Sequence, residues 1–204
     1  MRDLERALTD IRAMRSQIAR GTEFRGYGPA AFAATGVLAI FAALAQAHFI
    51  ENPSAETTTY LALWIAIALI AAVIVGADVV TRSRRVHSGL ADEMIQSAAE
   101  QLLPAGIAGA LLTIVIARTA PQSLWMLPGL WQIMLSVGVF AACRILPAPL
   151  FIVGVWYLGT GLACLAFGSG EHAFSPWAMG LPFGIGQLLA AALIYVIGLR
   201  DAED

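Results

Sequence analysis

Hydrophobic residues along this chain gather in six long blocks that are separated by short polar segments. The clearest block, from Leu61 to Ala77, has seventeen residues without a charge, and Asp78 and three arginines follow it closely. No water-soluble fold needs a helix that is apolar on every face and ends in a basic cluster. A bilayer does, because a helix satisfies its own backbone groups and hydrocarbon excludes charge. The pattern therefore predicts transmembrane helices, and the arginines indicate the cytoplasmic end of this one.

The order of the blocks predicts an all-α polytopic membrane protein with six transmembrane helices arranged as three hairpins. The helices are expected at residues 30–50, 59–81, 102–118, 124–143, 149–167 and 177–198. They form one transmembrane domain (29–199) between a cytoplasmic amphipathic helix with its linker (1–28) and an acidic cytoplasmic tail (200–204). Small residues let helices approach closely in membranes. The residues expected in that role are Gly106, Ala110, Gly159, Ala163, Gly180 and Gly184.

Composition and charge add an orientation and a location. The chain is 59% hydrophobic and 13% charged, whereas a soluble domain carries about 25% charged residues. With both termini in the cytoplasm, eleven of the twelve arginines lie inside and only Arg118 lies outside, as the positive-inside rule requires. The absence of lysine and the abundance of alanine indicate a GC-rich bacterial genome, hence the bacterial inner membrane. A net charge of −2 argues against direct binding of nucleic acid.

The N-terminal segment, residues 2–20, has the pattern of an amphipathic helix. Its apolar stripe follows a seven-residue repeat, and its arginines lie largely off that stripe. The helix can lie on the membrane surface beneath its own bundle, or it can bind a partner or a second copy. The residues that would face such a partner are Leu4, Ile11, Ile18, Arg12 and Arg15.

The stretch that follows, Thr22–Pro29 (TEFRGYGP), leads into the alanine-rich first span. Together with the N-terminal helix and that span, it resembles a group of small polytopic membrane proteins of proteobacteria that have no assigned reaction. The resemblance implies a link to winged-helix regulators and so a regulatory role. It implies no site residues.

Polar side chains at membrane depth are functional candidates, because burying them in hydrocarbon is costly. Asp78 is the only acid inside an apolar block, and it lies one helical turn from Arg82. A membrane-edge ion pair and a proton or cation relay both fit this spacing. Gln132 and Gln187 follow prolines and glycines that interrupt the fourth and sixth helices. Such breaks occur both where helices pack closely and at transporter sites. Two interpretations therefore remain for these glutamines: a ligand pocket, or helix packing alone.

Metal, cofactor and enzyme signals are weak. His48 and His172 both fall near the outer face beside acidic residues, which makes them the only metal-ligand candidates, but their spacing is not diagnostic. Cys143 and Cys164 sit inside apolar blocks and are expected to be buried thiols. The sequence contains no phosphate-binding loop, dinucleotide fingerprint or paired catalytic carboxylates. We therefore expect no cofactor and no enzymatic activity.

Two functions fit the sequence. The first is a membrane regulator, sensor or scaffold that acts through a cytoplasmic protein partner at the arginine-rich N-terminal helix. The alternative is a transporter or channel for a small solute, with its pocket at the broken fourth and sixth helices. The bilayer is a partner in either case. The oligomeric state stays open, because six spans can form a closed monomer or the protomer of a homo-oligomer.

Overall fold

The computed structural model describes residues 28–86, 91–143 and 146–203 of the chain, and these residues are helices joined by short loops. The α-helices are α2 (Pro29–Phe49), α3 (Thr57–Val86), α4 (Ala91–Thr119), α5 (Leu127–Ala142), α6 (Phe151–Phe167) and α7 (Pro176–Glu203). Three short 3-10 helices join them: η1 (Pro121–Met126), η2 (Ala148–Leu150) and η3 (Gly170–His172). The all-helical prediction is confirmed for this part of the chain. The predicted N-terminal helix and its partner-facing residues lie outside the described residues.

Five of the helices are long and apolar enough to cross a membrane: α2, α3, the η1–α5 unit, the η2–α6 unit and α7. Each of these helices follows an apolar run that no charged residue interrupts. Proline stands in the first turn of α2 and of α5, a position where a helix does not use the backbone N–H that proline lacks. In α4 the apolar part is the shorter stretch Leu103–Thr119. The chain is therefore a multi-pass membrane protein by helix length and composition, and the crossing by α4 stays a prediction.

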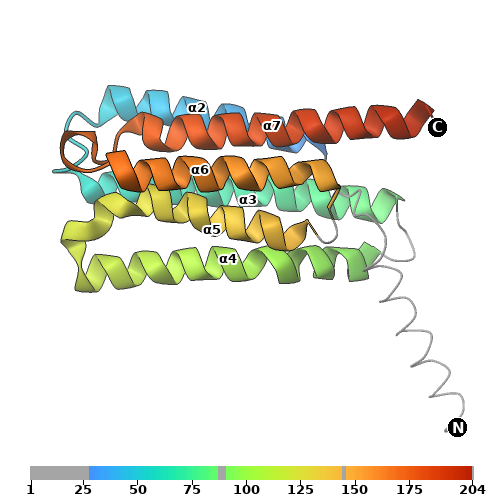
Figure 1. Cartoon of the computed structure of the whole chain (residues 1–204), viewed down its shortest axis with the longest axis horizontal. Helices are drawn as coiled ribbons and strands as arrows, with labels where there is room; N and C mark the ends of the chain where they lie inside the picture. The colour runs from blue at the N-terminus through green and yellow to red at the C-terminus, as the bar shows by residue number, and fades with distance from the viewer. Residues whose placement is uncertain (1–27, 87–90, 144–145, 204) are drawn as a thin grey trace, which may run out of the picture.

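The helices form a ring in which neighbours in sequence are also neighbours in space, and α7 closes the ring against α2 (Figure 1). The closest pairs are α2 with α7 and α5 with α6. The described chain begins and ends at the same end of the bundle (Figure 1). We call this end, which holds Gly28 and Asp78, the Asp78 end. The opposite end, formed by the α2–α3 loop, η1 and η3, is the η3 end.

Glycines explain why these two pairs are the closest. A Cβ added to Gly36 of α2 would lie 3.0 Å from the Gly184 carbonyl of α7. On the α5–α6 pair, a Cβ at Gly129 would lie 2.7 Å from the Gly161 carbonyl, and one at Gly161 would lie 2.8 Å from the Gly129 carbonyl. Backbones meet at these points, which gives the packing contacts that drive helix association in lipid.

The predicted set of small packing residues is only partly right. Gly184 packs against α2 as expected, and a Cβ at Gly180 would overlap Ala43 of the same helix. The other four residues do not pack within the described part of the chain. A Cβ at Gly106 or Gly159 would meet nothing within 4 Å, and Ala110 and Ala163 are exposed. These four small residues point away from the ring, where a membrane protein meets lipid.

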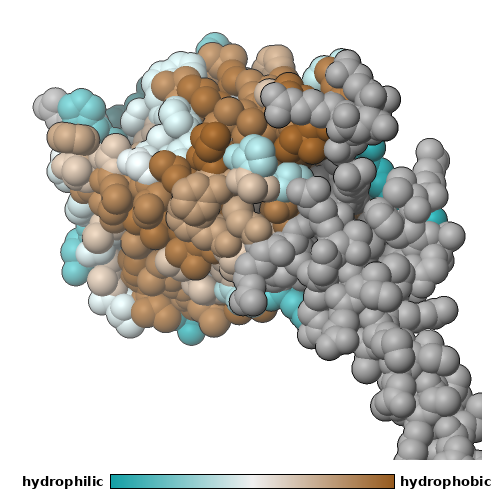
Figure 2. Space-filling model, turned by 45° about the vertical axis from the view of Figure 1, so that its right-hand side comes forward, coloured by the Kyte–Doolittle hydropathy of each residue, from teal (hydrophilic) through white to brown (hydrophobic). Residues whose placement is uncertain are grey.

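Large hydrophobic side chains cover much of the outside of the ring, and they dominate the described surface seen in Figure 2. Examples are Leu69 and Val73 on α3, exposed to 63% and 69%, and Ile107 on α4, exposed to 56%. In water such a surface would drive aggregation, whereas a bilayer covers it. The interior is therefore where polar groups with a specific role must be sought.

Candidate functional site

Near the η3 end, a glutamine ties three segments together. Gln46 of α2 is buried; its Nε2 donates to the Phe174 carbonyl at 2.8 Å, and Trp64 Nε1 of α3 donates to its Oε1 at 2.8 Å. Phe174 has a φ of 59°, a left-handed conformation that a non-glycine residue keeps only when its surroundings hold it. Its ring packs edge-on against Tyr60, with 4.9 Å between ring centroids. Gln46 thus holds Phe174 as a cover over this end of the core.

One turn further along the chain, α7 lacks a backbone hydrogen bond, and a side chain of α5 replaces it. Pro182 has no N–H, so the Ala178 carbonyl four residues earlier lacks its helical donor. Gln132 of α5 supplies one instead, because its Nε2 donates to the Ala178 oxygen at 2.9 Å. Cys164 Sγ of α6 approaches the same oxygen at 3.5 Å. The predicted glutamine and the predicted helix break therefore meet, and the amide nitrogen of Gln132 has a structural role.

At mid-length, three oxygen atoms from three helices have no partner. Ser136 Oγ of α5, the Tyr157 hydroxyl of α6 and Gln187 Oε1 of α7 are all buried, and none makes a hydrogen bond of acceptable geometry with a described residue. Ser136 is 0% exposed and Tyr157 is 1% exposed. The Tyr157 hydroxyl lies beside the Gln187 side chain without satisfying its Oε1. We call these three residues the polar layer.

The helix register places the three residues of this layer at one level. Along the antiparallel α5–α6 pair, Gly161 lies against Gln132 and Gly154 lies against Phe140. Ser136 falls midway between Gln132 and Phe140, and Tyr157 falls close to midway between Gly154 and Gly161. The two residues therefore lie at about the same height along the α5–α6 pair.

Helix α7 completes the layer. A Cβ at Gly186 would lie 2.5 Å from the Tyr157 hydroxyl, so the phenol occupies the room that this glycine leaves. Gln187 is the next residue along α7, and its Cβ lies 3.2 Å from the position that a Cβ on Gly36 of α2 would take. The layer thus lies where the α5–α6 and α2–α7 pairs come together, near the middle of each helix.

Two further polar atoms continue from this layer toward the η3 end. Gln132 Oε1, one turn from Ser136 on α5, is buried and unpartnered, as is the Tyr60 hydroxyl of α3. Tyr60 is within electrostatic range of Cys164, whose thiol accepts a hydrogen bond from Gln132 Nε2 at 3.5 Å. Buried polar atoms in native proteins are nearly always satisfied by protein, water or ligand. Five unpartnered atoms along the ring interior are therefore the strongest indication of a site in the described residues.

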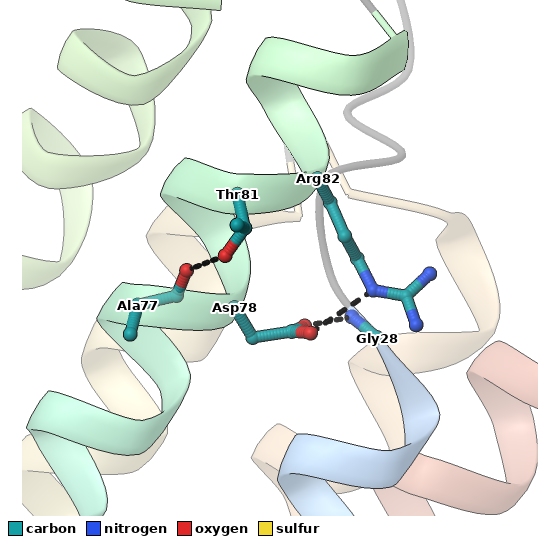
Figure 3. Close-up of polar contacts among 5 residues, drawn as sticks. All are labelled: Gly28, Ala77, Asp78, Thr81 and Arg82. Atoms are coloured by element: carbon teal, nitrogen blue, oxygen red, sulfur yellow. Dashed lines mark hydrogen bonds and ion pairs between the residues drawn. The ribbon is translucent and has the colours of Figure 1, made fainter.

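Asp78 lies elsewhere, at the opposite end of the bundle, and its contacts are structural. Its Oδ1 pairs with Arg82 Nε at 3.0 Å, as the sequence spacing allows, and its Oδ2 accepts from the Gly28 N–H at 2.7 Å (Figure 3). Thr81 beside it donates to the Ala77 carbonyl of its own helix (Figure 3). Gly28 precedes the first turn of α2, where a negative charge interacts favourably with the helix dipole. Asp78 therefore joins the start of α2 to α3.

The histidines give no support for a metal centre within the described residues. No group of three His, Cys, Asp or Glu side chains gathers among them. His48 and His172 are both exposed, and the His48 ring rests edge-on against the neighbouring Phe49 at 4.7 Å. The expectation from the sequence is no metal, with His48 and His172 as weak candidates, and that expectation stays untested.

Sequence reasoning found two members of the interior site, Gln132 and Gln187, and missed three others. Tyr60, Ser136 and Tyr157 carry hydroxyl groups inside apolar runs, where such residues are common. The signal for Ser136 was present, because it follows Gln132 by four residues and so lies on the same helix face. The sequence of α6 alone does not predict that Tyr157 lies at the same height as Ser136 of α5, because this depends on how the two helices are aligned.

Comparisons with known proteins add no assignment: no protein-family model, no curated protein and no solved structure matches the chain.

Proposed function

We propose that this protein binds a small polar solute inside its helix ring and moves it across the bacterial inner membrane. In this proposal all six long helices cross the bilayer as three hairpins, α4 included, and both termini lie in the cytoplasm. The observation that carries the proposal is the polar layer, in which three helices bring three unpartnered oxygens together at mid-length. Transporter sites lie at this depth and use helices interrupted by proline or glycine. Helix α7 carries Pro182 inside its length, whereas Pro128 stands at the start of α5.

The break in α7 supports the same proposal. Proline and glycine interruptions let a helix present carbonyl and side-chain groups to a solute, provided that neighbours satisfy the freed backbone. Gln132 does this for Ala178 at 2.9 Å. Helix α7 thus lacks one backbone hydrogen bond, between one and two turns from Gln187, while the freed carbonyl stays paired. Gln132 Oε1 and Gln187 Oε1, which face the interior without partners, are left to contact a solute.

The test is flux into liposomes that contain the purified protein, measured over a panel of small neutral and charged solutes. Gln187→Leu keeps the size of the side chain and removes its polar atoms, so it should abolish the flux of the transported solute. Gln122→Leu, in the exposed part of η1, is the matched control and should leave flux unchanged. Equal flux in the Gln187 variant and the wild type would remove this residue from the proposal.

A second function, regulation through a cytoplasmic partner of the N-terminal helix, is supported by the contact at Gly28. The N-terminal segment joins the bundle at a residue that is hydrogen-bonded to Asp78. A partner that pulls on this segment would therefore act on both α2 and α3. Co-purification from native membranes, comparing the wild type with a deletion of residues 1–25, tests this function. A cytosolic protein that is retained only by the intact chain would support it.

A further inference from the structure

We infer that the polar layer is a binding site for a small neutral solute that donates hydrogen bonds, of the alcohol or amide class. This inference rests on the proposed solute function and specifies its substrate. The site consists of Ser136 Oγ, the Tyr157 hydroxyl and Gln187 Oε1, with Gln132 Oε1 one turn away. All four oxygens are buried, and none makes a hydrogen bond of acceptable geometry with a described residue, although the Tyr157 hydroxyl lies beside the Gln187 side chain.

The hydrogen-bonding capacity of these atoms selects a donor. An amide oxygen can only accept, so Gln187 Oε1 and Gln132 Oε1 each need an N–H or O–H donor, which a solute can supply. The two hydroxyl groups, on Ser136 and Tyr157, can each donate or accept. A ligand that donates one hydrogen to Gln187 Oε1 and also carries an acceptor for a hydroxyl matches the polar layer, and a second donor would reach Gln132 Oε1 one turn away. Alcohols and simple amides have both features in a few atoms.

The charges around the layer favour a neutral solute over an ion. Among the described residues, carboxylate and guanidinium groups occur only toward the ends of the bundle. Asp78 and Arg82 lie at one end, and Glu51 and Arg118 lie toward the other. An ion at mid-length would lose its hydration with no opposite charge to replace it. A neutral solute avoids this cost.

Apolar side chains pack around Tyr157 of the layer. The Tyr157 ring packs against Phe183 with 5.4 Å between centroids. Leu135 and Val139 of α5 pack on the same hydrophobic cluster. These apolar side chains surround Tyr157, so a solute with a short alkyl part would match them.

The same geometry separates binding from a structural role. An unpartnered buried hydroxyl destabilises the fold, so its removal should leave the fold equally stable or make it more stable. A hydroxyl that holds the helices together would have the opposite effect. The hydroxyls of the polar layer should therefore lower stability and raise solute affinity, the trade-off expected of a binding site.

The experiment is solute entry into proteoliposomes followed by stopped-flow light scattering, with glycerol, urea and acetamide as neutral probes and potassium and acetate as charged ones. The variants are Tyr157→Phe and Ser136→Ala, which each remove one oxygen. The controls are Tyr195→Phe, an exposed tyrosine of α7, and Thr160→Val, whose hydroxyl bonds to the Trp156 carbonyl of its own helix at 2.9 Å. Thermal unfolding in detergent is measured for every variant.

We expect at least one neutral probe to enter faster than in empty liposomes. Each site variant should slow that entry by about tenfold, the effect of one lost hydrogen bond. The melting temperature should stay the same or rise, and both controls should behave as the wild type. Neutral flux that is unchanged in both site variants would overturn the site while leaving the solute function standing. A preference for potassium or acetate would overturn the neutral class. No flux of any probe through folded protein would overturn the solute function together with the site.

Discussion

Gln132 Nε2 donates at 2.9 Å to the Ala178 carbonyl, which is the oxygen that Pro182 leaves without a helical donor. A side chain of α5 thus completes the backbone of α7. The same amide keeps its Oε1 unpaired toward the interior. The side-chain nitrogen of Gln132 therefore stabilises the fold, while its oxygen is available to a ligand. The effect of substituting Gln132 should consequently depend on whether Pro182 is present.

Replacing Gln132 by Leu should lower the free energy of unfolding by about 1–3 kcal/mol, because the Ala178 carbonyl loses its main donor in an apolar interior. Pro182→Ala restores a backbone N–H four residues after Ala178 and should reduce this loss. Thermal unfolding of the two single variants and the double variant gives the coupling energy. Additive effects would show that the side chain and the proline act independently.

The α5–α6 contact should be intolerant of a single methyl group. Gly161→Ala places a Cβ 2.8 Å from the Gly129 carbonyl, which cannot move aside without separating the helices. We expect a loss of about 1–3 kcal/mol. Gly159→Ala, two residues away and facing open space, should be neutral or stabilising because alanine favours helix. Equal melting temperatures for the two variants would contradict this packing.

The cover at the η3 end should depend on Gln46. Gln46→Leu leaves the Phe174 carbonyl and the Trp64 N–H without partners, so a loss of about 2 kcal/mol is expected. The loop around Phe174 should also exchange its amide hydrogens faster, since its left-handed conformation loses its main restraint. Hydrogen exchange of residues 168–175 measures this, with Gln122→Leu as an exposed control. Unchanged exchange in this loop would show that Gln46 does not restrain it.

The contacts of Asp78 should differ in strength. Arg82 is 45% exposed, so Arg82→Gln should cost less than about 1 kcal/mol, as exposed ion pairs usually do. Asp78→Asn keeps an acceptor for the Gly28 N–H and should have a similarly small effect. Asp78→Leu removes that acceptor and should lower the melting temperature further than either of the other two. A larger effect of the arginine variant would make the ion pair, and not the link to α2, the main contact.

The sequence predicts features that lie within one helix better than contacts between two helices. The helices follow from their apolar runs, so α2 at 29–49 and α6 with η2 at 148–167 agree closely with expectation. The Asp78–Arg82 pair was also predicted, because it lies within one helix. The contact of Asp78 with Gly28 was not, because α2 and α3 meet in a register that neither of them specifies.

The glycines show the same limit. Gly161 and Gly159 are two residues apart in one apolar run, yet one touches a neighbouring backbone and the other faces open space. Their local sequences contain no feature that tells them apart. The polar layer depends equally on register, because Ser136 and Tyr157 become one site only when α5 and α6 are aligned.

The closure of the ring by α7 against α2 also bears on how the protein is made. Gln46 and the Phe174 carbonyl that it binds are 128 residues apart. The first described helix therefore leaves the ribosome well before the last, and its closest neighbour does not yet exist. Until α7 arrives, the side of α2 that carries Gly36 and Gln46 lacks its protein neighbour, and the translocon or an assisting factor must cover it. Truncation before α7 should consequently expose the chain to membrane quality-control proteases, even though most of its apolar segments are already complete.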